Sequence, residues 1–594
     1  MHKTKSLQRD DSRIIIHFDY DCFYASVVEN ENPALKSVPL AIQQKQIVVT
    51  CNYEARRRGL RKLQLITDAK RVCPEAVIVL GEDLTRFRDA SKELYNFLQQ
   101  RIWSGRAERL GFDEVWLDCT DMVDYNLDLL NHNDLSHSFF CLSKDDPTIG
   151  FEYNASDVFG PTYPPNMLKP VQLTEEENRL EQRLIVGSHL ARCLRHELES
   201  QKGYTSTVGI ATNKLLSKLV GNVNKPKNQT TIIPPYEPVG DTRTSINGFL
   251  DHHDIGKIPG VGFKISQKIR AHVLGRQAEF SDGLVYGGTK ESVTVLDVRS
   301  HPAMGPELLE EILSGPGAPK GIGGKVWELI HGIDDGEVGR TKRIPSQISQ
   351  EDSYMKYLRT FEQVREQLHL LGERLIRRMQ MDLMEEDEEA GDMGEPGHQR
   401  HWLAHPRTLR LSTRPRPAPG PDGVRARTFH RISRSAPMPN FVFSLTEAPS
   451  VLAERLVDDA LVPMFRALHH EKAGWNLSLV NVAATNMAET AADSKESKGR
   501  DIGKMFRRQD EVLKDFKVTD EPGATDSPQR YSPDILAVQP HQDGLADTDD
   551  NLMTAAGWDS DASETEVLEH CDVCQSAMPS FAMPAHRRYH ELND

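Results

Sequence analysis

The most informative stretch of the sequence is Ile14-Ile15-Ile16-His17-Phe18-Asp19-Tyr20-Asp21-Cys22-Phe23-Tyr24. Its apolar, β-branched start is typical of a buried strand. Asp19 and Asp21 follow at spacing i, i+2, which in a strand puts both carboxylates on one face. The stretch therefore predicts a carboxylate carried at the end of a rigid strand, where a cleft would lie.

A second acidic stretch is Glu108-Arg109-Leu110-Gly111-Phe112-Asp113-Glu114-Val115-Trp116-Leu117-Asp118. It is short, apolar on both sides and centred on Asp113 and Glu114. Two carboxylate-bearing strands side by side could hold two divalent cations about 3.5–4 Å apart, as in-line phosphoryl transfer requires. Oxygen ligands favour Mg²⁺ or Mn²⁺. Taken singly, either stretch is equally compatible with a solvated turn.

The chain has 594 residues, which predicts several domains, and a net charge of −16. An acidic total counts against a nucleic-acid binder, but a binding face needs only local basicity. No apolar run of about 18 residues predicts a membrane span, and the polar start up to Asp11 predicts no secretory signal. Six scattered cysteines indicate reduced intracellular thiols; they are Cys22, Cys51, Cys73, Cys119, Cys141 and Cys193.

Strand-like and helix-like segments alternate from Ile14 to about Pro234, which predicts an α+β, palm-like sheet. We expect a hairpin of 40–42 with 47–51, helices at 53–59, 83–103, 183–200 and 213–220, a buried strand at 206–211, and an elaborated loop over 124–180.

The second half begins with a helical, glycine-rich region at about 240–340. Its Ile258-Pro259-Gly260-Val261-Gly262 predicts a short hairpin that exposes backbone N–H groups. Another α+β unit follows, with an acidic insert at 381–397 and a change to disorder-prone composition beyond about 490. Its expected strands are 346–353, 407–414, 441–444 and 475–482.

Positive charge is concentrated in this second α+β unit. Between Trp402 and Arg434 eight arginines stand against one aspartate. Arg410 and Arg414 would share one face of a strand, which suits DNA phosphates, although a solvated basic loop would have the same composition. The eight are Arg407, Arg410, Arg414, Arg416, Arg425, Arg427, Arg431 and Arg434.

Cationic pairs at helical spacing could bind a triphosphate. Tyr53 and Arg56 lie three residues apart and Lys214 and Lys218 four apart, so each pair shares a helix face. Taken alone, each pair is more often a surface feature. The Tyr24 ring could lie under the sugar of a bound nucleotide, or could be an ordinary core aromatic.

Several segments together resemble the Y-family of translesion DNA polymerases over about residues 12–487. The segments are 18–24, 50–56 (Thr-Cys-Asn-Tyr-Glu-Ala-Arg), 81–86 (Gly-Glu-Asp-Leu-Thr-Arg), 109–114, 213–218 (Asn-Lys-Leu-Leu-Ser-Lys) and Asn224-Lys225-Pro226. Within the family, Gln43-Gln44-Lys45 and the run Val48 to Arg56 are similar to one branch. A sibling branch, which also carries a terminal zinc finger, is the alternative.

The resemblance implies a catalytic set. Asp19, Asp113 and Glu114, with the Tyr20 carbonyl, would ligate two Mg²⁺ or Mn²⁺ ions, and Tyr24 would exclude a ribose 2′-OH. The incoming dNTP would be held by Tyr53, Arg56, Lys218 and Lys214, and Gln44, Lys45 and Ile47 would narrow the pocket over the template base.

The resemblance also implies a right-hand architecture. We expect a flexible N-terminus (1–11), a palm (12–21 and 83–235), fingers (22–82), a thumb with a helix-hairpin-helix (236–340) and a little finger (344–488, insert 381–400). Gly260 and Gly262 would hold a DNA phosphate, and Arg410 and Arg414 would cross the duplex. The expected activity is low-fidelity nucleotidyl transfer to a primer 3′-OH, without a proofreading exonuclease and in the nucleus.

The tail has zinc-ligand spacing in Cys571-x2-Cys574-x11-His586-x3-His590. A small metal-folded unit at 565–594, after a disordered linker at 489–564, resembles the ubiquitin-binding zinc finger of translesion polymerases. It departs from that pattern at Arg587-Arg588-Tyr589, where an acidic residue often stands. A chance Cys/His cluster is the alternative.

Residues 499–506 form a degenerate sliding-clamp (PCNA) peptide through Ile502, Met505 and Phe506, or a generic amphipathic turn. A non-catalytic scaffold that bridges ubiquitin, the clamp and repair factors is the second functional hypothesis. Three acidic residues at Asp19, Asp113 and Glu114 favour the enzyme, because a scaffold has no need of convergent carboxylates.

Overall fold

The computed structural model describes residues 7–165, 173–236, 246–279, 289–315, 318–340, 344–386, 400–416, 431–471 and 475–489, and the strand residues 568–570 and 577–579. The chain forms two compact units, one of residues 1–341 with 540–594 and one of residues 342–539. Among the described helices, none combines the length and the apolar character that crossing a bilayer requires.

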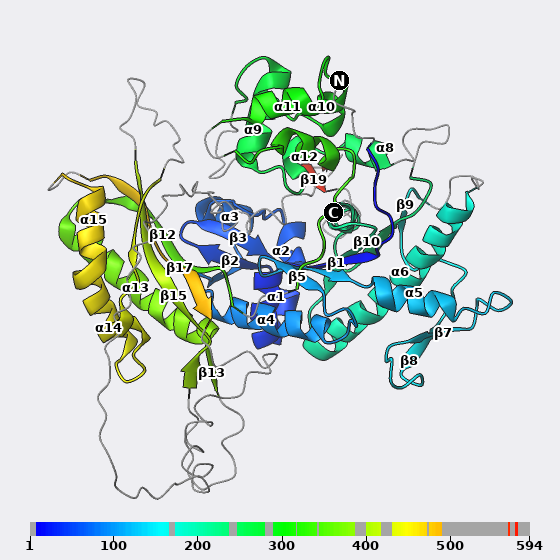
Figure 1. Cartoon of the computed structure of the whole chain (residues 1–594), viewed down its shortest axis with the longest axis horizontal. Helices are drawn as coiled ribbons and strands as arrows, with labels where there is room; N and C mark the ends of the chain where they lie inside the picture. Colours follow the sequence, from blue (N-terminus) through cyan, green and yellow to red (C-terminus); the bar gives the residue numbers. More distant parts are fainter. Residues whose placement is uncertain are drawn as a thin grey trace, which may run out of the picture. The chain divides into compact units, whose positions relative to one another are not determined.

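The first unit is built on a six-stranded sheet with the order β5-β6-β1-β10-β11-β9 (Figure 1). The central strand β1 (Ile15–Tyr20) runs antiparallel to both neighbours, and Asp19 stands opposite Glu114 on one side and Thr207 on the other. The remaining strands are β5 (Ala107–Leu110), β6 (Glu114–Asp118), β9 (Thr162–Tyr163), β10 (Ser206–Ala211) and β11 (Gln229–Ile232).

The two faces of this sheet differ in chemistry. All six residues of β1 are buried, and Ile16 and Phe18 join the large core under α5 (Thr120–Asp128) and α6 (Glu175–Lys202). The close approach of α6 is visible at Gly187, where an added Cβ would lie 3.0 Å from Ile14 Cγ2. The opposite face carries His17 and Asp19. The predicted buried strand is therefore confirmed, and its acidic residue Asp19 is buried as well.

Helix α7 (Lys214–Gly221) lies on that polar face. The Asn213 side chain accepts a hydrogen bond from Leu216 N at 2.9 Å and caps the helix N-terminus. Gly209 permits the contact, because a Cβ there would stand 1.9 Å from Ser217 O and 2.5 Å from Gly221 N. The helix backbone therefore touches the sheet backbone.

Residues 334–339, which we name the strap, cover the next part of the same face. Arg13 donates to the Asp334 and Gly336 carbonyls, each at 3.0 Å. Val338 is buried against Ile15 and Trp116. The strap thus closes the sheet beside α7.

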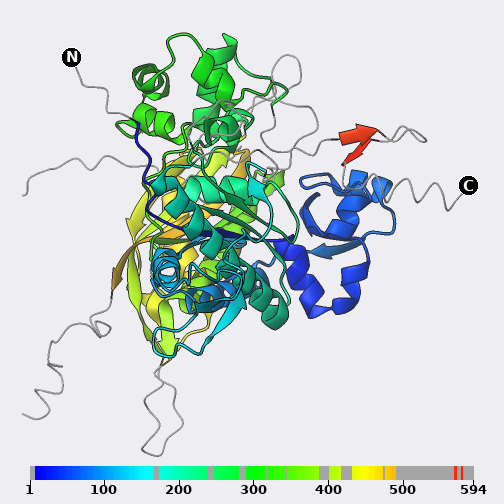
Figure 2. The same ribbon diagram turned by 90° about the vertical axis from the view of Figure 1, so that its right-hand side faces the viewer.

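A small three-stranded sheet of order β3-β2-β4 follows β1 in sequence. Figure 2 shows its elements in blue as a lobe of their own. The predicted hairpin is confirmed as β2 (Leu40–Gln44) and β3 (Ile47–Cys51), with a turn at Lys45 and Gln46. The other elements of this part of the chain are α1 (Phe23–Glu31), η1 (Pro33–Ser37), α2 (Tyr53–Arg57), α3 (Ile66–Val72) and β4 (Val77–Leu80). Helix α4 (Thr85–Gln99) follows them and contacts α6 and β5 beside the six-stranded sheet.

In its described residues, the polar stretch 124–180 contains more secondary structure than the predicted loop. It contains the hairpin β7 (Ser138–Cys141) and β8 (Gly150–Tyr153), held by the stacked rings of Phe140 and Phe151 at 5.1 Å. Helix α6 also begins eight residues earlier than expected, at Glu175, where Thr174 and Glu177 form a capping box.

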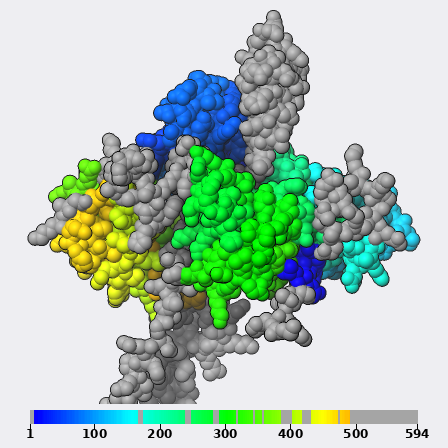
Figure 3. Space-filling view, turned by 90° about the horizontal axis from the view of Figure 1, so that it is seen from above, coloured from blue at the N-terminus to red at the C-terminus, as the bar shows by residue number. Residues whose placement is uncertain are grey.

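The glycine-rich region is helical, as predicted, and forms the rounded green surface of Figure 3. Gly260 adopts φ +88° between η3 (Ile255–Lys257) and α9 (Phe263–Leu274). Its other helices are α8 (Ile246–Asp251), α10 (Val295–Ser300), α11 (Pro306–Leu313) and α12 (Ile322–Leu329).

The second unit has a four-stranded sheet of order β12-β17-β15-β16 with its own core. One predicted strand is wrong, since 441–444 contains the 3₁₀-helix η4 (Asn440–Phe443), and one strand, β16 (Ile432–Pro437), was missed. The other strands are β12 (Gln347–Leu358), β15 (Ala404–Pro415) and β17 (Leu477–Glu489). The helices are α13 (Phe361–Leu383), α14 (Pro449–Leu456), the π-helical η5 (Val457–Leu461) and α15 (Val462–Leu468).

Two short strand pairs complete the described elements. β13 (Met384–Glu386) and β14 (Arg400–Trp402) flank the acidic insert, of which residues 387–399 lie outside the described chain. β18 (Leu568–His570) and β19 (Ala577–Pro579) pair antiparallel in the C-terminal part.

Candidate active site

Two carboxylates meet on the polar face of the six-stranded sheet. Asp19 at the end of β1 and Glu114 at the start of β6 are register partners, and each residue is only 1% exposed. Directly opposed residues of an antiparallel pair project to the same side of the sheet. The structure therefore brings these two predicted site residues together.

Glu114 is neutralised by α7. Lys218 Nζ donates to both carboxylate oxygens of Glu114 at 2.6 Å, and His17 Nε2 lies 3.5 Å from Glu114 Oε1. Burial by itself raises the pKa of Glu114, but the Lys218 charge and His17 outweigh it and hold that pKa well below its usual value. Burial lowers the pKa of His17, against the effect of Glu114.

Asp19 is neutralised by a different lysine. Lys225 Nζ donates to Asp19 Oδ2 at 2.7 Å, and both side chains are almost fully buried. Lys225 lies in the loop between α7 and β11. Two buried acids and two ammonium groups thus balance in charge, as burial demands.

Asp113 flanks this pair. It is half-buried just before β6, and its carbonyl accepts a hydrogen bond from Tyr20 N at 2.8 Å. Burial, reinforced by the Asp113 charge, raises the pKa of the Tyr24 phenol. Tyr24, in the first turn of α1, stacks on Phe87 with ring centroids 4.3 Å apart and stands 6.2 Å from Phe112.

The register of β1 and β6 brings Asp19 and Glu114 together, and the convergence of Asp113 with them stays a prediction. In the described residues, no three acidic, histidine or cysteine side chains gather as a metal-binding group. Three close carboxylates repel one another unless cations lie between them, so a shared site of these three residues would depend on bound ions. The donors still suit Mg²⁺ or Mn²⁺, since they are oxygens and the ammonium contacts at 2.6–2.7 Å mark where positive charge is required.

Asp21 lies just beyond the end of β1, and its contact with Thr207, the register partner of Asp19, is consistent with the predicted shared face. The Asp21 carboxylate accepts hydrogen bonds from Thr207 Oγ1 at 2.7 Å and from Lys227 N at 3.0 Å. Burial raises the pKa of Asp21, and these two hydrogen bonds counteract the rise.

The predicted triphosphate ligands are found on two helices. The Arg56 guanidinium lies 4.6 Å from the Tyr53 ring centroid on α2, so this pair shares a face as expected. Lys214 and Lys218 share the Trp116 side of α7, but Lys214 Nζ donates to both Glu108 oxygens at 3.0–3.1 Å rather than to Glu114. The strap adds to that contact, since Gly339 N donates to Glu108 Oε2 at 2.7 Å.

The predicted pocket residues occupy the tip of the β2–β3 hairpin. Gln44 Nε2 donates to Gly81 O at 2.6 Å, and Lys45 N donates to Glu82 Oε1 at 3.2 Å. Lys45 has φ +52°, as a tight turn requires, and Ile47 is half-buried. The hairpin tip is thereby fixed to the segment before α4.

The backbone at Gly262 and the strand register at Arg410 and Arg414 are compatible with the predicted DNA contacts. Gly262 precedes α9 as its N-cap without a side-chain hydrogen bond, and a Cβ at Gly262 would meet nothing within 4 Å. Arg410 stands opposite Ser435, and Arg414 lies two residues beyond Ser412 opposite Ser433, so both arginines project to one face of the sheet.

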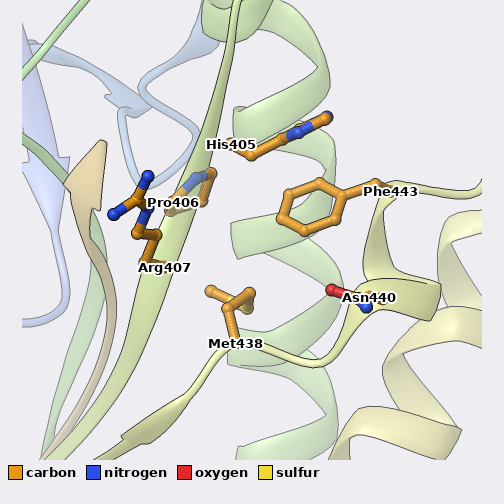
Figure 4. Close-up of a pocket in the computed structure, with 6 residues that line it drawn as sticks. All are labelled: His405, Pro406, Arg407, Met438, Asn440 and Phe443. Carbon is orange, nitrogen blue, oxygen red and sulfur yellow. The ribbon is translucent and has the colours of Figure 1, made fainter. Parts of the chain in front are cut away.

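A separate hollow of about 420 Å³ lies in the second unit (Figure 4). Its walls come from the start of β15, the residue after β16 and η4, and none of these side chains carries a carboxylate. The lining residues are His405, Pro406, Arg407, Met438, Asn440 and Phe443. The hollow is thus unrelated to the acidic site.

The remaining predicted residues lie outside the described chain. They are the zinc ligands Cys571, Cys574, His586 and His590, and the clamp residues Ile502, Met505 and Phe506.

Sequence reasoning missed Lys225 and Gly209. Lys225 lies in a loop, where helical periodicity gives no signal, although Asn224-Lys225-Pro226 was part of the resemblance. Gly209 sits inside a strand pattern, and a glycine there is a signal for close backbone approach.

Comparison with known proteins matches the impB/mucB/samB family to residues 18–222 and the C-terminal domain of that family to residues 345–498. DNA polymerase iota of Homo sapiens is 31% identical over 476 residues, 80% of this chain and 52% of the human protein. DNA polymerase iota of Mus musculus is 40% identical over 268 residues, 45% of this chain and 32% of the mouse protein.

DNA polymerase eta of Drosophila melanogaster is 28% identical over 306 residues, 47% of this chain and 33% of that relative. The chain spans about half the length of the human relative and about a third of the mouse one. The branch that residues 43–56 resemble is iota, and the sibling branch is eta. The identities to the two iota polymerases, 31% and 40%, are higher than the 28% to eta and favour iota.

Proposed function

The chain belongs to the impB/mucB/samB family, the Y-family of DNA polymerases, and from that premise we propose a template-directed, low-fidelity polymerase of the iota type. It would add dNTPs to a primer 3′-OH on damaged templates. The observation that carries the proposal is the register pair of Asp19 and Glu114, buried side by side and each neutralised by a lysine.

Asp19, Asp113 and Glu114, with the Tyr20 carbonyl, would hold two Mg²⁺ or Mn²⁺ ions, which when bound stabilise the charge that develops on the phosphates during nucleotidyl transfer. Lys225 and Lys218 would then turn from the carboxylates to the triphosphate oxygens. Tyr53 and Arg56 would add a second clamp on the same triphosphate, with the planar Arg56 fork matching its oxygens.

Tyr24 would act as the gate against ribonucleotides. Its ring is fixed by the stack on Phe87, so it cannot easily yield to a 2′-OH. Gln44, Lys45 and Ile47 would narrow the space over the template base from the hairpin tip. A small lobe encloses the nascent pair loosely, which explains low discrimination and tolerance of damaged bases.

In this proposal the six-stranded sheet is the palm, the three-stranded lobe the fingers, residues 236–340 the thumb and residues 344–488 the little finger. Gly260 and Gly262 would present backbone N–H groups to a DNA phosphate, and Arg410 and Arg414 would bind phosphates along the duplex. Recruitment in the nucleus by ubiquitin through 565–594 and by the clamp through 499–506 completes the proposal.

The direct test is primer extension with each dNTP and each template base, in Mg²⁺ and in Mn²⁺. We expect incorporation that differs most between template A and template T for an iota-type enzyme. Asp113→Ala should abolish incorporation while DNA binding survives, because it removes an ion ligand and no DNA contact.

Asp121→Ala, an acid in the first turn of α5, is the matched control and should behave as the wild type. Normal extension by Asp113→Ala would refute the assignment. DNA binding without any incorporation by the wild-type chain would favour the scaffold hypothesis.

A further inference from the structure

Asp21 is a buried carboxylate that the proposed chemistry does not use. It is only 4% exposed, and both of its oxygens accept hydrogen bonds, from Thr207 Oγ1 and from Lys227 N. Its backbone is also fixed, because Asp21 N donates to Thr205 O at 3.0 Å and Ser26 Oγ donates to Asp21 O at 2.7 Å. Asp21 therefore connects β10, α1 and the loop after α7.

That loop, residues 224–228, carries Lys225 to Asp19. Lys227 has φ +49°, a left-handed conformation that is unfavourable for a residue with a Cβ. Such a conformation persists only where neighbouring contacts impose it. The Lys227 N–H is held by Asp21, and Lys227 Nζ reaches Glu199 Oε1 at 2.5 Å.

We propose that Asp21 is a positioning residue for the incoming nucleotide, which places the Lys225 ammonium at the site by holding the Lys227 N–H. The proposal rests on the proposed polymerase function and adds a role for the second acid of the β1 stretch. Lys225 is two residues from Lys227, so release of that N–H moves the Lys225 backbone. A hydrogen bond from an N–H to a carboxylate is also among the stronger kinds in proteins.

The inference predicts a particular kinetic pattern. Asp21→Asn keeps the size of the side chain but removes its negative charge, so the Lys227 N–H is held at best by a neutral amide oxygen, a weaker acceptor than a carboxylate. We expect the KM for dNTP to rise about tenfold with kcat changed less than about threefold, because a misplaced ammonium weakens triphosphate binding rather than the carboxylate pair.

The test is equilibrium dNTP binding, without chemistry, to the full chain on a primer that ends in a dideoxynucleotide. Asp21→Asn should weaken the dNTP Kd about tenfold. In a Lys225→Ala background, the same change should weaken the Kd less than about twofold, since the group that Asp21 positions is already gone. Unchanged thermal unfolding of Asp21→Asn would separate positioning from folding.

Glu199→Gln is the control, since it alters only the contact of the exposed Lys227 Nζ, and its Kd should match the wild type. A wild-type Kd for Asp21→Asn, or an undiminished effect in the Lys225→Ala background, would overturn the inference. Failure of the wild-type chain to bind or incorporate dNTPs would overturn the proposed function itself.

Discussion

At the scale of single residues, Gly209 sets how closely helix α7 approaches the sheet. A Cβ added at Gly209 would lie 1.9 Å from Ser217 O, so it would collide with backbone rather than with a flexible side chain. The helix can accept a larger residue only by moving away as a body. Lys218 would move with it and would no longer reach Glu114.

Gly209→Ala should therefore destabilise the protein by about 1–3 kcal/mol, the usual range for overpacking, and weaken dNTP binding. Thermal unfolding and the dNTP Kd measure the two effects. Gly324→Ala on α12, where an added Cβ meets nothing within 4 Å, is the matched control and should be neutral or slightly stabilising. A fully stable and active Gly209→Ala chain would contradict the close approach of helix and sheet.

The two lysines of α7 show what spacing can and cannot predict. The i, i+4 rule correctly puts Lys214 and Lys218 near one another on the helix. It cannot say which acid each one meets, and the register of β5 and β6 assigns Glu108 to Lys214 and Glu114 to Lys218. Lys225 could not be found in this way, because a loop has no period.

At the scale of elements, the strap holds together parts of the first unit that are far apart in the sequence. It does so on the face of β1 that carries His17 and Asp19. Arg13 holds two of its carbonyls and Val338 fills the space between Ile15 and Trp116. Trp116 Nε1 in turn donates to Lys214 O at 3.1 Å, so the strap also supports the start of α7.

Val338→Ala should destabilise the first unit by about 1–2 kcal/mol, because two methyl groups are removed from the core and leave a small cavity. Chemical denaturation followed by Trp fluorescence measures this change. Glu337→Ala, next to it, removes an exposed pair with Arg106 and should change stability little. Equal effects from the two substitutions would show that Val338 is not a core residue.

The second element with a testable role is the sheet face that carries Arg410 and Arg414. Seen in register, it also carries the small polar side chains of Ser412, Ser433 and Ser435. Small polar groups around arginines let a phosphate backbone approach closely, and the helices cover the other face.

Replacing Arg410 or Arg414 by alanine should lower DNA affinity and reduce the slope of log K against log salt by about 0.9 for each phosphate that is no longer neutralised. Arg434 stands opposite Leu411, a core residue, and so belongs to the other face. Arg434→Ala should therefore leave the slope nearly unchanged. Titrations at several salt concentrations distinguish the variants.

Most helices and strands were predictable, because a long periodic pattern of apolar residues marks the face of an element that is buried on folding. The hairpin at 40–51, the buried strand at 206–211 and helix α4 were found from such patterns. Phe441–Ser444 is apolar enough for a strand, yet the flanking Pro439 and its short length leave it a 3₁₀ turn. Strand β16 was missed because Ile432–Pro437 is an exposed edge strand with serine and arginine in place of an apolar alternation.

At the scale of the whole molecule, several histidines are held neutral by packing. Burial lowers the pKa of His253, His189 and His331 below the usual 6.5. The unfolded chain then binds protons more readily than the folded chain, so acid favours unfolding once the pH falls below about 6.5.

We expect the thermal midpoint to fall between pH 6.5 and 5, before the carboxylates titrate. His253→Gln should reduce that fall, because the substituted side chain no longer takes up a proton on unfolding. His252→Gln, a neighbour in sequence, is the control. A midpoint independent of pH across this range would contradict the role of the buried histidines.

The pairing of each buried acid with a lysine has a consequence for the order of assembly. A lone divalent cation entering this site must displace an ammonium group that then has no counter-ion, whereas a cation arriving with a triphosphate brings the anion that the displaced lysine needs. Ion and nucleotide should accordingly associate as one cooperative event, with little affinity for either in isolation. Without substrate, each buried carboxylate would thereby keep its lysine partner until the ion and the nucleotide bind together.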